Sequence, residues 1–437
     1  MSVFSRGTAS RSRMRTVIGG IAIAGASALV LAGCSGGGGT AEPSEPAAPA
    51  EDLTLKIGTI LPQTGSLSFL GPPEEAGVGL AAQDVNDYAE TTGLTIDDIV
   101  WGDSGDTDNK AYATTIQTLI SEGVTAAIGA ASSGVTKLFL DDAVAAGIIT
   151  FSPANTSAEF TSWDDNGLYW RTAPSDTLQG EVLGNLLAED GHSNVAVLYQ
   201  NDSYGTGLTA VFKETFEASG GSIVEEQSYN TGDDNFDAQV SAILASNPDA
   251  ILLVTFNEFY TIGPALLAAG YPAENLYLVD GNLKNFSVPD ATGLTWPAEL
   301  SLEGAKGTTP AGPAPDTDFQ ARLSDWWVGE GNAELTDYSY ANESYDAVIL
   351  LALASLAANS TDPAEVAAKL QEVSGGSGDG EKCTEFKECA DIILGGGVAD
   401  YDGYSGPITF ADNGDPTEAT IGVFQYGADN KSVRIDL

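Results

Sequence analysis

Short apolar segments and amphipathic segments alternate along most of the chain. Residues 194–200 (NVAVLYQ) contain a continuous apolar run, 195–199, that is typical of a strand buried on both faces. In the following segment, 206–219, the residues Leu208, Phe212 and Phe216 recur at the spacing of one helix face. A chain of strands that are each followed by a helix predicts a parallel sheet with helices on both faces.

This alternation occurs in two series. The first predicts strands at 53–61, 99–102, 125–130 and 148–151, with helices at 74–90, 110–122 and 134–146. The second starts from 169–172 and predicts strands at 194–200, 222–229, 250–256 and 276–280, with helices at 176–190, 206–219, 236–246 and 258–269. After residue 303 we expect a crossing segment at 304–315, helices at 318–329, 340–358 and 363–372, and strands at 406–410 and 419–426. Two such series indicate two similar α/β lobes.

The N-terminal residues are typical of an export signal. Residues 1–16 contain four arginines and no acid, and residues 17–32 form an apolar run that is short for a membrane span. Leu31, Ala32, Gly33 and Cys34 match the lipobox of bacterial lipoprotein signals at every position. We therefore expect residues 1–33 to be removed and Cys34 to be acylated. A plain signal peptide or a short membrane anchor is the alternative.

Residues 34–51 are rich in Gly, Ser, Pro, Ala and Glu and lack large apolar residues. Such a segment cannot form a core, so we expect a flexible tether. It would hold a soluble body at the outer face of the cytoplasmic membrane.

The charge of the chain limits its partners. Its 437 residues include 17 basic and 62 acidic side chains, and loss of the signal would leave 13 basic residues and a formal charge of −49. We therefore expect no binding to nucleic acid or to an anionic membrane surface by electrostatics. The acidity suits solubility outside the cell, with adaptation to high salt as the alternative.

Two cysteines remain once Cys34 is assigned to lipid. An exported compartment permits disulfides, so we expect a short bridge between Cys383 and Cys389. Two free thiols are the alternative. No zinc-ligand spacing occurs in the sequence, and we expect neither a metal nor another cofactor.

The sequence contains no familiar catalytic pattern. His192 is the single histidine, and it precedes a predicted strand rather than following one. Active-site groups of open parallel sheets lie beyond the carboxyl ends of strands, so His192 is badly placed for a Ser-His-Asp arrangement. We therefore expect a protein that is not an enzyme, in preference to an extracellular hydrolase.

Polar residues follow the strands of the first series. Ser132 and Ser133 come after the strand 125–130 and begin a helix, where backbone amides suit a carboxylate. The next strand leads to Ala154 and Thr156, whose carbonyl and hydroxyl groups we expect in the same crevice. A plain helix cap is the alternative for the two serines.

The second series ends its strands in aromatic and acidic residues. Tyr204, Phe256, Glu258 and Asp280 follow three of these strands and are expected to face the first group across a cleft. Carboxylate donors on one lobe and a carboxylate acceptor on the other predict a site for a zwitterion. Each acid alone could instead be a solvated or capping residue.

Several segments together resemble the branched-chain amino-acid-type (type I) periplasmic binding proteins of ABC importers. They are IGTILPQTGSLSFLGPPEEAGVGLAAQDVN, IGAASSGVT, FSPANTS, YWRTAPSDTLQG, LYQNDSYGTGL, SYDAVILLALA and YDGYSGPITF. The resemblance implies two Rossmann-like lobes joined by three crossings, which close on a ligand by hinge motion. We expect lobe 1 at 52–172 and 305–405, and lobe 2 at 173–304 and 406–437.

The resemblance also implies roles for individual residues. Phe256 stands where a tyrosine is common and Asp280 where a glutamate is common, and both departures disfavour a leucine-type ligand. The resemblance implies that the α-carboxylate and α-amino groups are held by Ser132, Ser133, Ala154 and Thr156, and that Asp280 pairs with the ammonium. Tyr204 would cover the ligand, and Phe69 and Leu70 would surround its side chain.

We therefore expect an extracytoplasmic lipoprotein that captures an amino acid and delivers it to the permease of an ABC importer. A ligand-sensing receptor of the same fold is the alternative, as is a protein that binds an amide, urea or an aromatic acid.

Overall fold

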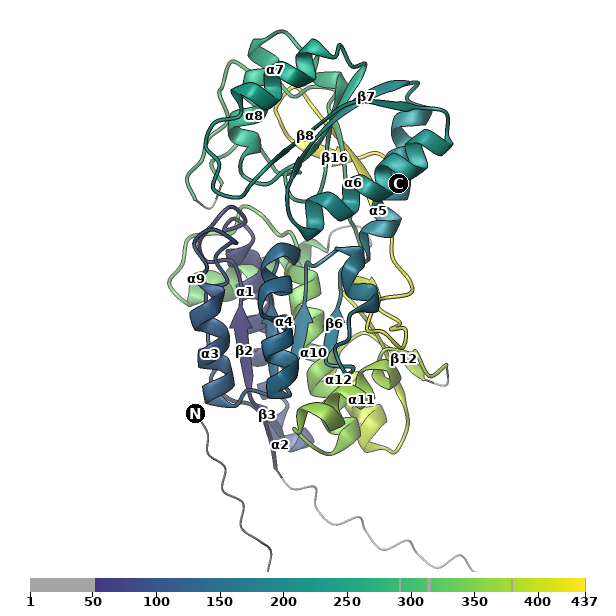
Figure 1. Cartoon of the computed structure of the whole chain (residues 1–437). Coiled ribbons are helices and arrows are strands. Elements are labelled where there is room, and N and C mark those ends of the chain that lie inside the picture. The colour runs from purple at the N-terminus through teal and green to yellow at the C-terminus, as the bar shows by residue number, and fades with distance from the viewer. Residues whose placement is uncertain (1–51, 291, 313–315, 379, 437) are drawn as a thin grey trace, which may run out of the picture. The chain divides into compact units, whose positions relative to one another are not determined.

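The computed structural model describes residues 52–290, 292–312, 316–378 and 380–436. Within these residues, two main β-sheets each carry helices on both faces (Figure 1). Strands and helices alternate along most of the chain, as the apolar pattern predicts. The predicted signal, the lipidated Cys34 and the tether lie outside the described residues.

Four parallel strands form the first sheet, in the order β2-β4-β5-β6. They cover Ile57–Ile60, Ala126–Gly129, Ile149–Ser152 and Tyr169–Arg171. Successive side chains of β4 enter different cores, Ala126 and Ile128 on one face and Ala127 on the other, because strand side chains alternate in direction. The sheet is buried on both faces, which explains why β4 and β5 contain no charged residue.

Helices from distant parts of the chain cover this sheet. One face packs against α3 (Tyr112–Glu122) and α4 (Ser133–Ala146), and the other against α1 (Gly71–Asn86), α10 (Ala341–Ala358) and α11 (Pro363–Val373). Lobe 1 therefore needs residues from both ends of the described chain. The smaller elements around it are β1 (Leu53–Leu55), α2 (Ala89–Thr92), β3 (Leu94–Ile96), η1 (Ala158–Ser162) and α9 (Thr317–Gly329).

Seven strands form the second sheet, in the order β16-β15-β11-β10-β9-β7-β8. β15 is antiparallel to both of its neighbours, and the other pairs are parallel. The strands cover Asn194–Gln200 (β7), Ser222–Tyr229 (β8), Ala250–Val254 (β9), Leu276–Leu278 (β10), Lys306–Pro310 (β11), Ile421–Tyr426 (β15) and Ser432–Arg434 (β16). The helices around this sheet are α5 (Asp176–Glu189), α6 (Ser203–Ala218), α7 (Asp237–Ala245) and α8 (Phe259–Ala268), with the short turn η2 (Ala273–Asn275).

The structure corrects some predicted elements. The predicted crossing at 304–315 contains β11, which ends in Pro310, a position where proline can be accommodated in a strand. The predicted strand 99–102 makes only an isolated bridge through Val100, and the strand that was missed is β3. Beyond residue 380, the sequence pattern also missed β12 (Glu381–Cys383), α12 (Phe386–Leu394) and β13 (Ala399–Gly403), which pairs with β14 (Gly406–Pro407).

These elements move two of the predicted lobe limits. β11 pairs in the second sheet, so a limit at 305 separates this strand from its partners. Phe410 packs in the first core, where its ring centroid lies 5.9 Å from that of Phe151 and 5.1 Å from that of Trp170. We therefore propose that the crossings follow residues 310 and 410 rather than 304 and 405.

Arg171 joins two of the crossings. It is fully buried at the end of β6, and its Nε donates to Asp415 Oδ1 at 2.6 Å. Its Nη1 donates to the backbone oxygen of Ser157 at 2.8 Å. Because a buried charge needs close partners, this network fixes the end of β6 against the last crossing.

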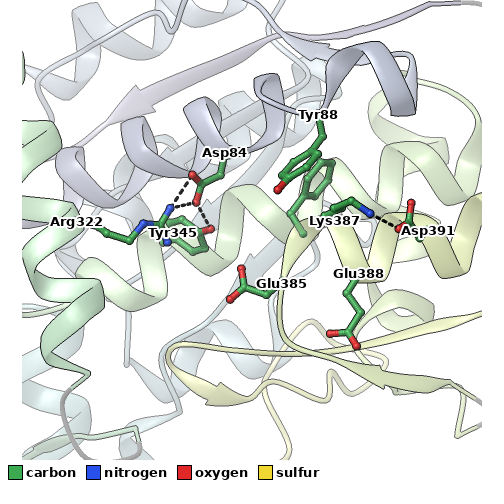
Figure 2. Close-up of a pocket in the computed structure, with 9 residues that line it drawn as sticks. Asp84, Tyr88, Arg322, Tyr345, Glu385, Lys387, Glu388 and Asp391 are labelled. Carbon is green, nitrogen blue, oxygen red and sulfur yellow. Dashed lines mark hydrogen bonds and ion pairs between the residues drawn. The ribbon is translucent and has the colours of Figure 1, made fainter.

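A polar cluster ties α1, α9 and α10 together beside a surface pocket of about 550 Å³ (Figure 2). Arg322 Nη2 donates to both carboxylate oxygens of Asp84, at 2.7 and 2.5 Å, and the Tyr345 hydroxyl donates to Asp84 at 2.6 Å. The cluster satisfies its own charges, so we interpret it as a structural contact.

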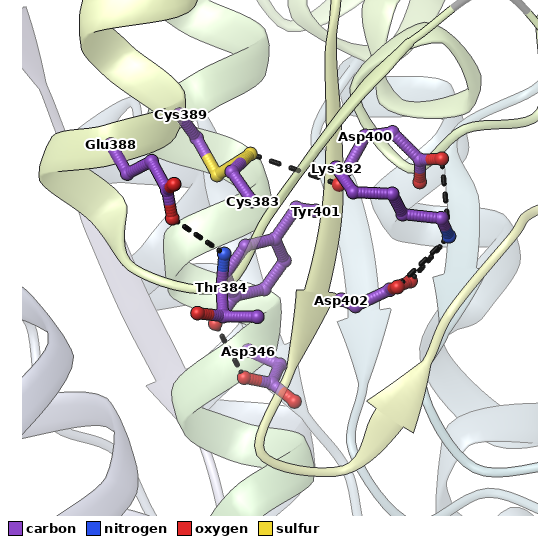
Figure 3. The surroundings of a disulfide bond; sticks show 9 residues. All are labelled: Asp346, Lys382, Cys383, Thr384, Glu388, Cys389, Asp400, Tyr401 and Asp402. Atoms are coloured by element: carbon purple, nitrogen blue, oxygen red, sulfur yellow. Dashed lines mark hydrogen bonds and ion pairs between the residues drawn. A yellow bond between two sulfur atoms is a disulfide. The ribbon is translucent and has the colours of Figure 1, made fainter.

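The predicted disulfide between Cys383 and Cys389 is confirmed, with an S–S distance of 2.03 Å (Figure 3). It joins β12 to α12. Beside it, the Tyr401 hydroxyl donates to Asp346 of α10 at 2.7 Å. The bridge and this hydrogen bond hold the α12 region against the core of lobe 1.

Among the described residues, no single helix has the length and apolar composition needed to cross a membrane. α10 and α11 meet those requirements only as a pair, with a bend of 106° between them.

Candidate functional site

A small cavity lies at the carboxyl ends of strands from both sheets. It has a volume of about 20 Å³, which is room for about one water molecule. Eight of the ten predicted binding residues line it: Leu70, Ser132, Ser133, Ala154, Thr156, Tyr204, Phe256 and Asp280. Leu67, Ala131, Gly281 and Tyr340 complete the lining.

The N-terminus of α4 forms one wall of the cavity. Ser132 is the N-cap, and its hydroxyl accepts from the Val135 backbone amide at 3.3 Å. The Ser133 hydroxyl accepts from the Ser157 amide, also at 3.3 Å. Ser132 is therefore a helix cap and Ser133 holds the loop after β5, and the helix end that they surround favours an anion.

The loop after β5 brings Ala154 and Thr156 into the cavity. Two buried side chains hold this loop: Ser152 Oγ donates to the Ala130 oxygen at 2.7 Å, and Asn155 Nδ2 donates to the same oxygen at 2.9 Å. The Thr156 hydroxyl is buried and makes no hydrogen bond with any residue that the structure describes. A polar group of this kind is suited to a ligand, because burial without a partner is costly.

Asp280 follows β10 and is the main acid of the cavity. Its carboxylate accepts from the Tyr204 hydroxyl at 2.7 Å, Gln179 Nε2 at 3.0 Å and the Tyr340 hydroxyl at 3.0 Å. All three donors are neutral, and no ion pair within the described part of the chain includes Asp280. Burial raises the pKa of Asp280, and these hydrogen bonds oppose that change. A cationic ligand group would supply the missing counter-charge.

Sequence reasoning missed Tyr340, which reaches Asp280 from lobe 1. It directly precedes α10 and has a left-handed backbone conformation, with φ of 59°. A non-glycine residue rarely adopts this conformation, so the surrounding structure must hold it in place. Tyr340 does not follow a strand, and the strand-end rule therefore did not select it.

Aromatic rings cover the second wall. The rings of Tyr204 and Phe256 are stacked, with centroids 5.4 Å apart. Tyr204 lies in the first turn of α6, where Asp202 caps the helix by accepting from the Gly205 amide at 2.8 Å. This cap fixes the direction in which Tyr204 approaches the cavity.

Glu258 and Phe69 do not line the cavity. Glu258 Oε2 accepts from the Phe256 amide and the Tyr229 hydroxyl, both at 3.1 Å, so the acid stabilises its own turn. Glu258 therefore lies outside the lining of the cavity, and its contact with a ligand stays a prediction. The Phe69 ring instead lies below the ammonium group of Lys284, with 3.4 Å between Nζ and the ring centroid.

A second buried acid lies close to Asp280. Asp176 begins α5, and neither of its carboxylate oxygens has a hydrogen-bond partner among the residues described. Burial and the nearby Asp280 raise the pKa of Asp176 well above its usual value. The Asp280 end of the cavity therefore has a second acid near it, which disfavours a carboxylate of the ligand there.

Within the described ranges, no cluster of three or more His, Cys, Asp or Glu residues is arranged to hold a metal ion. The site therefore consists of hydroxyls, amides, acids and aromatic rings.

Comparison with known proteins identifies relatives of the whole body. A family model described as periplasmic binding protein matches residues 54–384. The leucine-, isoleucine-, valine-, threonine- and alanine-binding protein of Pseudomonas aeruginosa is 26% identical over 324 residues, which are 73% of this chain and 82% of that protein. The chemotactic signal transduction substrate-binding protein BasB of Halobacterium salinarum is 24% identical over 372 residues, 81% of this chain and 83% of that protein.

Solved structures share the fold. The leucine-binding protein LivK of Thermotoga maritima superposes with a TM-score of 0.67 at 22% identity, covering 87% of this chain and 97% of that one. A solute-binding protein of R. palustris in complex with benzoate also has a TM-score of 0.67, at 19% identity, covering 87% of this chain and 95% of that one. The predicted fold, two α/β lobes of the type I periplasmic-binding kind, is thereby confirmed.

Proposed function

Because the chain belongs to the periplasmic binding protein family, we propose that it captures an amino acid between its lobes and delivers it to the permease of an ABC importer. The observation that carries this proposal is Asp280, a buried carboxylate with three neutral donors and no cationic partner among the described residues. Across the cavity, the N-terminus of α4 favours an anion. An α-amino acid carries both of the required charges on one carbon atom.

The lining residues suggest how the ligand is held. The carboxylate would meet the end of α4 at Ser132 and Ser133, and the ammonium would pair with Asp280. The free Thr156 hydroxyl and the Ala154 carbonyl can serve either group. Apolar residues of the loop before α1, Leu67 and Leu70, would contact the ligand side chain.

The family consists of binding proteins rather than enzymes. Two relatives nevertheless suggest variants of the function. BasB is named for chemotactic signal transduction, so a sensor without an importer is a second candidate. The benzoate complex raises an aromatic acid as ligand, but benzoate has no ammonium and would leave the buried Asp280 without a counter-charge.

A panel of ligands tests this proposal. We expect one or more amino acids to raise the melting temperature of the protein, because a ligand at 1,000 times its Kd stabilises the folded state by about 4 kcal/mol. Benzoate, urea and simple amides should have little effect. Strong stabilisation by a carboxylate without an ammonium, and none by any amino acid, would exclude the proposal.

We further propose that the protein is anchored by lipid at Cys34, since the lipobox is complete. Cys34→Ala should move the protein from the membrane fraction to the soluble fraction of its host. Retention of the variant in the membrane fraction would contradict acylation at this site.

A further inference from the structure

Lys284 is a buried cation near the proposed ligand site. It lies four residues after Asp280, and only 4% of its surface is exposed. Its backbone is clamped by Tyr426, whose hydroxyl accepts from the Lys284 amide at 3.0 Å and donates to the Lys284 oxygen at 2.8 Å. The side chain therefore starts from a fixed point on lobe 2.

The ammonium group of Lys284 has incomplete partners. It donates to Asn257 Oδ1, and the nearest carboxylate oxygen, Asp290 Oδ2, is 3.8 Å away, beyond a good hydrogen bond. Its other close neighbours are the rings of Phe69, at 3.4 Å from the centroid, and Tyr260, at 5.2 Å, and the charges of Asp337 and Glu258 act on it from farther away. Burial lowers the pKa of Lys284 to about 8, so the group stays largely charged at neutral pH. It can still donate to another acceptor.

The contact between Phe69 and Lys284 joins the two walls of the ligand site. Phe69 packs in one apolar cluster with the cavity residues Leu67 and Leu70. Lys284 belongs to the loop that also carries Asp280 and Gly281, which line the cavity from the second sheet. The cavity holds about one water molecule, so an amino acid can enter only if the walls separate. The space that opens beside Phe69 is then bordered by a lysine ammonium group.

We propose that Lys284 recognises the side chain of the ligand, and that the substrate class is amino acids with an acidic side chain. This inference rests on the proposed function. When the walls separate, Lys284 Nζ loses its contact with the Phe69 ring and binds the side-chain carboxylate of the ligand instead. The site would then provide a helix end and a lysine for two carboxylates and Asp280 for one ammonium, which is the charge pattern of aspartate and glutamate.

A branched apolar side chain fits this place less well. It would displace the cation–π contact and offer no hydrogen bond to the buried ammonium group. A lysine that served only to hold the lobes together would affect all ligands alike, because its contribution would not depend on the ligand side chain. The ratio of the affinities for an acidic and an apolar amino acid therefore distinguishes recognition of the ligand side chain from a role in holding the lobes together.

Titration calorimetry on the mature chain with L-glutamate, L-aspartate and L-leucine tests the inference. For the unaltered protein we expect at least one acidic amino acid to bind 10-fold or more tightly than leucine. Lys284→Met should weaken acidic ligands at least 10-fold and change leucine binding less than threefold. Lys213→Met, at a solvent-accessible lysine of the same lobe that pairs with Glu226, is the matched control and should change neither affinity.

Two outcomes would overturn the role of Lys284 alone. These are tighter binding of leucine than of both acidic ligands, or an equal loss for all ligands in Lys284→Met. Binding of no amino acid at all would overturn the proposed function with it. Lys284→Gln, which retains a hydrogen-bond donor of similar length, provides a second variant if the methionine variant does not fold.

Discussion

The Asp280 carboxylate accepts hydrogen bonds from two tyrosines and a glutamine, which belong to three separate parts of the chain. These donors orient the carboxylate and partly offset its burial, but they leave its charge unpaired. The cost of holding this charge is recovered when a cation binds. At the scale of single residues, this arrangement supports the proposal that the site is assembled in advance for an ammonium group.

Asp280→Asn tests this arrangement, since it keeps the shape of the side chain and removes the charge. We expect it to weaken the binding of an amino acid by about 2–5 kcal/mol, as loss of one member of a buried charge pair does. Glu258→Gln is the control, because Glu258 stabilises a turn and does not line the cavity. Calorimetry that finds equal affinity for Asp280→Asn and the unaltered protein would contradict an ammonium partner at this position.

Glu343 gives a second prediction at this scale. It lies in the first turn of α10, and burial is the main cause that raises its pKa to about 7. Well below pH 4.5 the acid is protonated in both the folded and the unfolded chain, and the folded state loses stability as the pH rises from about 4.5 to about 7. We expect Glu343→Gln to increase the free energy of unfolding at pH 8 by about 1–3 kcal/mol and to have no effect at pH 4.

Urea denaturation of this variant at the two pH values measures the difference. The matched control is Glu365→Gln, in the first turn of α11, where the side chain is exposed. A Glu343→Gln variant that is less stable than the unaltered protein at pH 8 would show that the carboxylate is needed in its charged form.

At the scale of elements, α12 and β12 form an attachment to the core that depends on a covalent bridge. The Cys383–Cys389 disulfide closes a loop with a sequence separation of 6. In the chain-entropy model, a loop of this size stabilises the folded state by about 2 kcal/mol. We expect the double substitution to serine to lower the free energy of unfolding by about that amount and to leave ligand affinity unchanged, because the bridge is remote from the cavity residues.

Denaturation and calorimetry on the double variant measure both quantities. A large loss of ligand affinity at unchanged stability would mean that the α12 region influences ligand binding in the cleft. Unfolding of the whole protein would mean that the bridge contributes much more than loop closure.

The elements also show how far the sequence could predict the structure. β7 was predicted with its observed limits, because seven consecutive residues carry an apolar strand pattern with no ambiguity. β11 was predicted as a crossing, because Gly307, two threonines and Pro310 are also typical of a loop. What places this strand in the sheet is pairing with β10 and β15, and such pairing depends on residues far away in sequence.

The candidate site was predictable to a similar extent. Strand ends located seven of the twelve lining residues, because the carboxyl edge of a parallel sheet has a simple relation to the sequence, and the family resemblance added Leu70. The direction of a side chain has no such relation, and Glu258 therefore turned out to accept from its own turn. Tyr340 and Lys284 could be found only from the packing of the two lobes.

At the scale of the whole molecule, the structure has a cavity that is too small for an amino acid. We expect the lobes to separate in solution and to close again around the ligand. Small-angle scattering should give a smaller radius of gyration with saturating ligand than without it. Tyr340→Phe, which removes the hydrogen bond between Tyr340 and Asp280, should shift the unliganded protein further toward the open form.

The Glu365→Gln variant provides the comparison for scattering as well. An equal radius of gyration with and without ligand would contradict closure. A larger radius with ligand would indicate that binding opens the protein.

The division of lobe 1 between two distant segments also affects the order in which the chain can fold. The sheet strands of residues 57–171 emerge first, but α10, which covers one face of that sheet, ends only at Ala358. At the usual synthesis rate of about 5–20 residues per second, roughly 10–40 s separate the two segments. During that interval the apolar residues of β4 and β5 that later meet α10 lack the cover of that helix. We therefore expect the core of lobe 1 to be completed only after α10 has been synthesised.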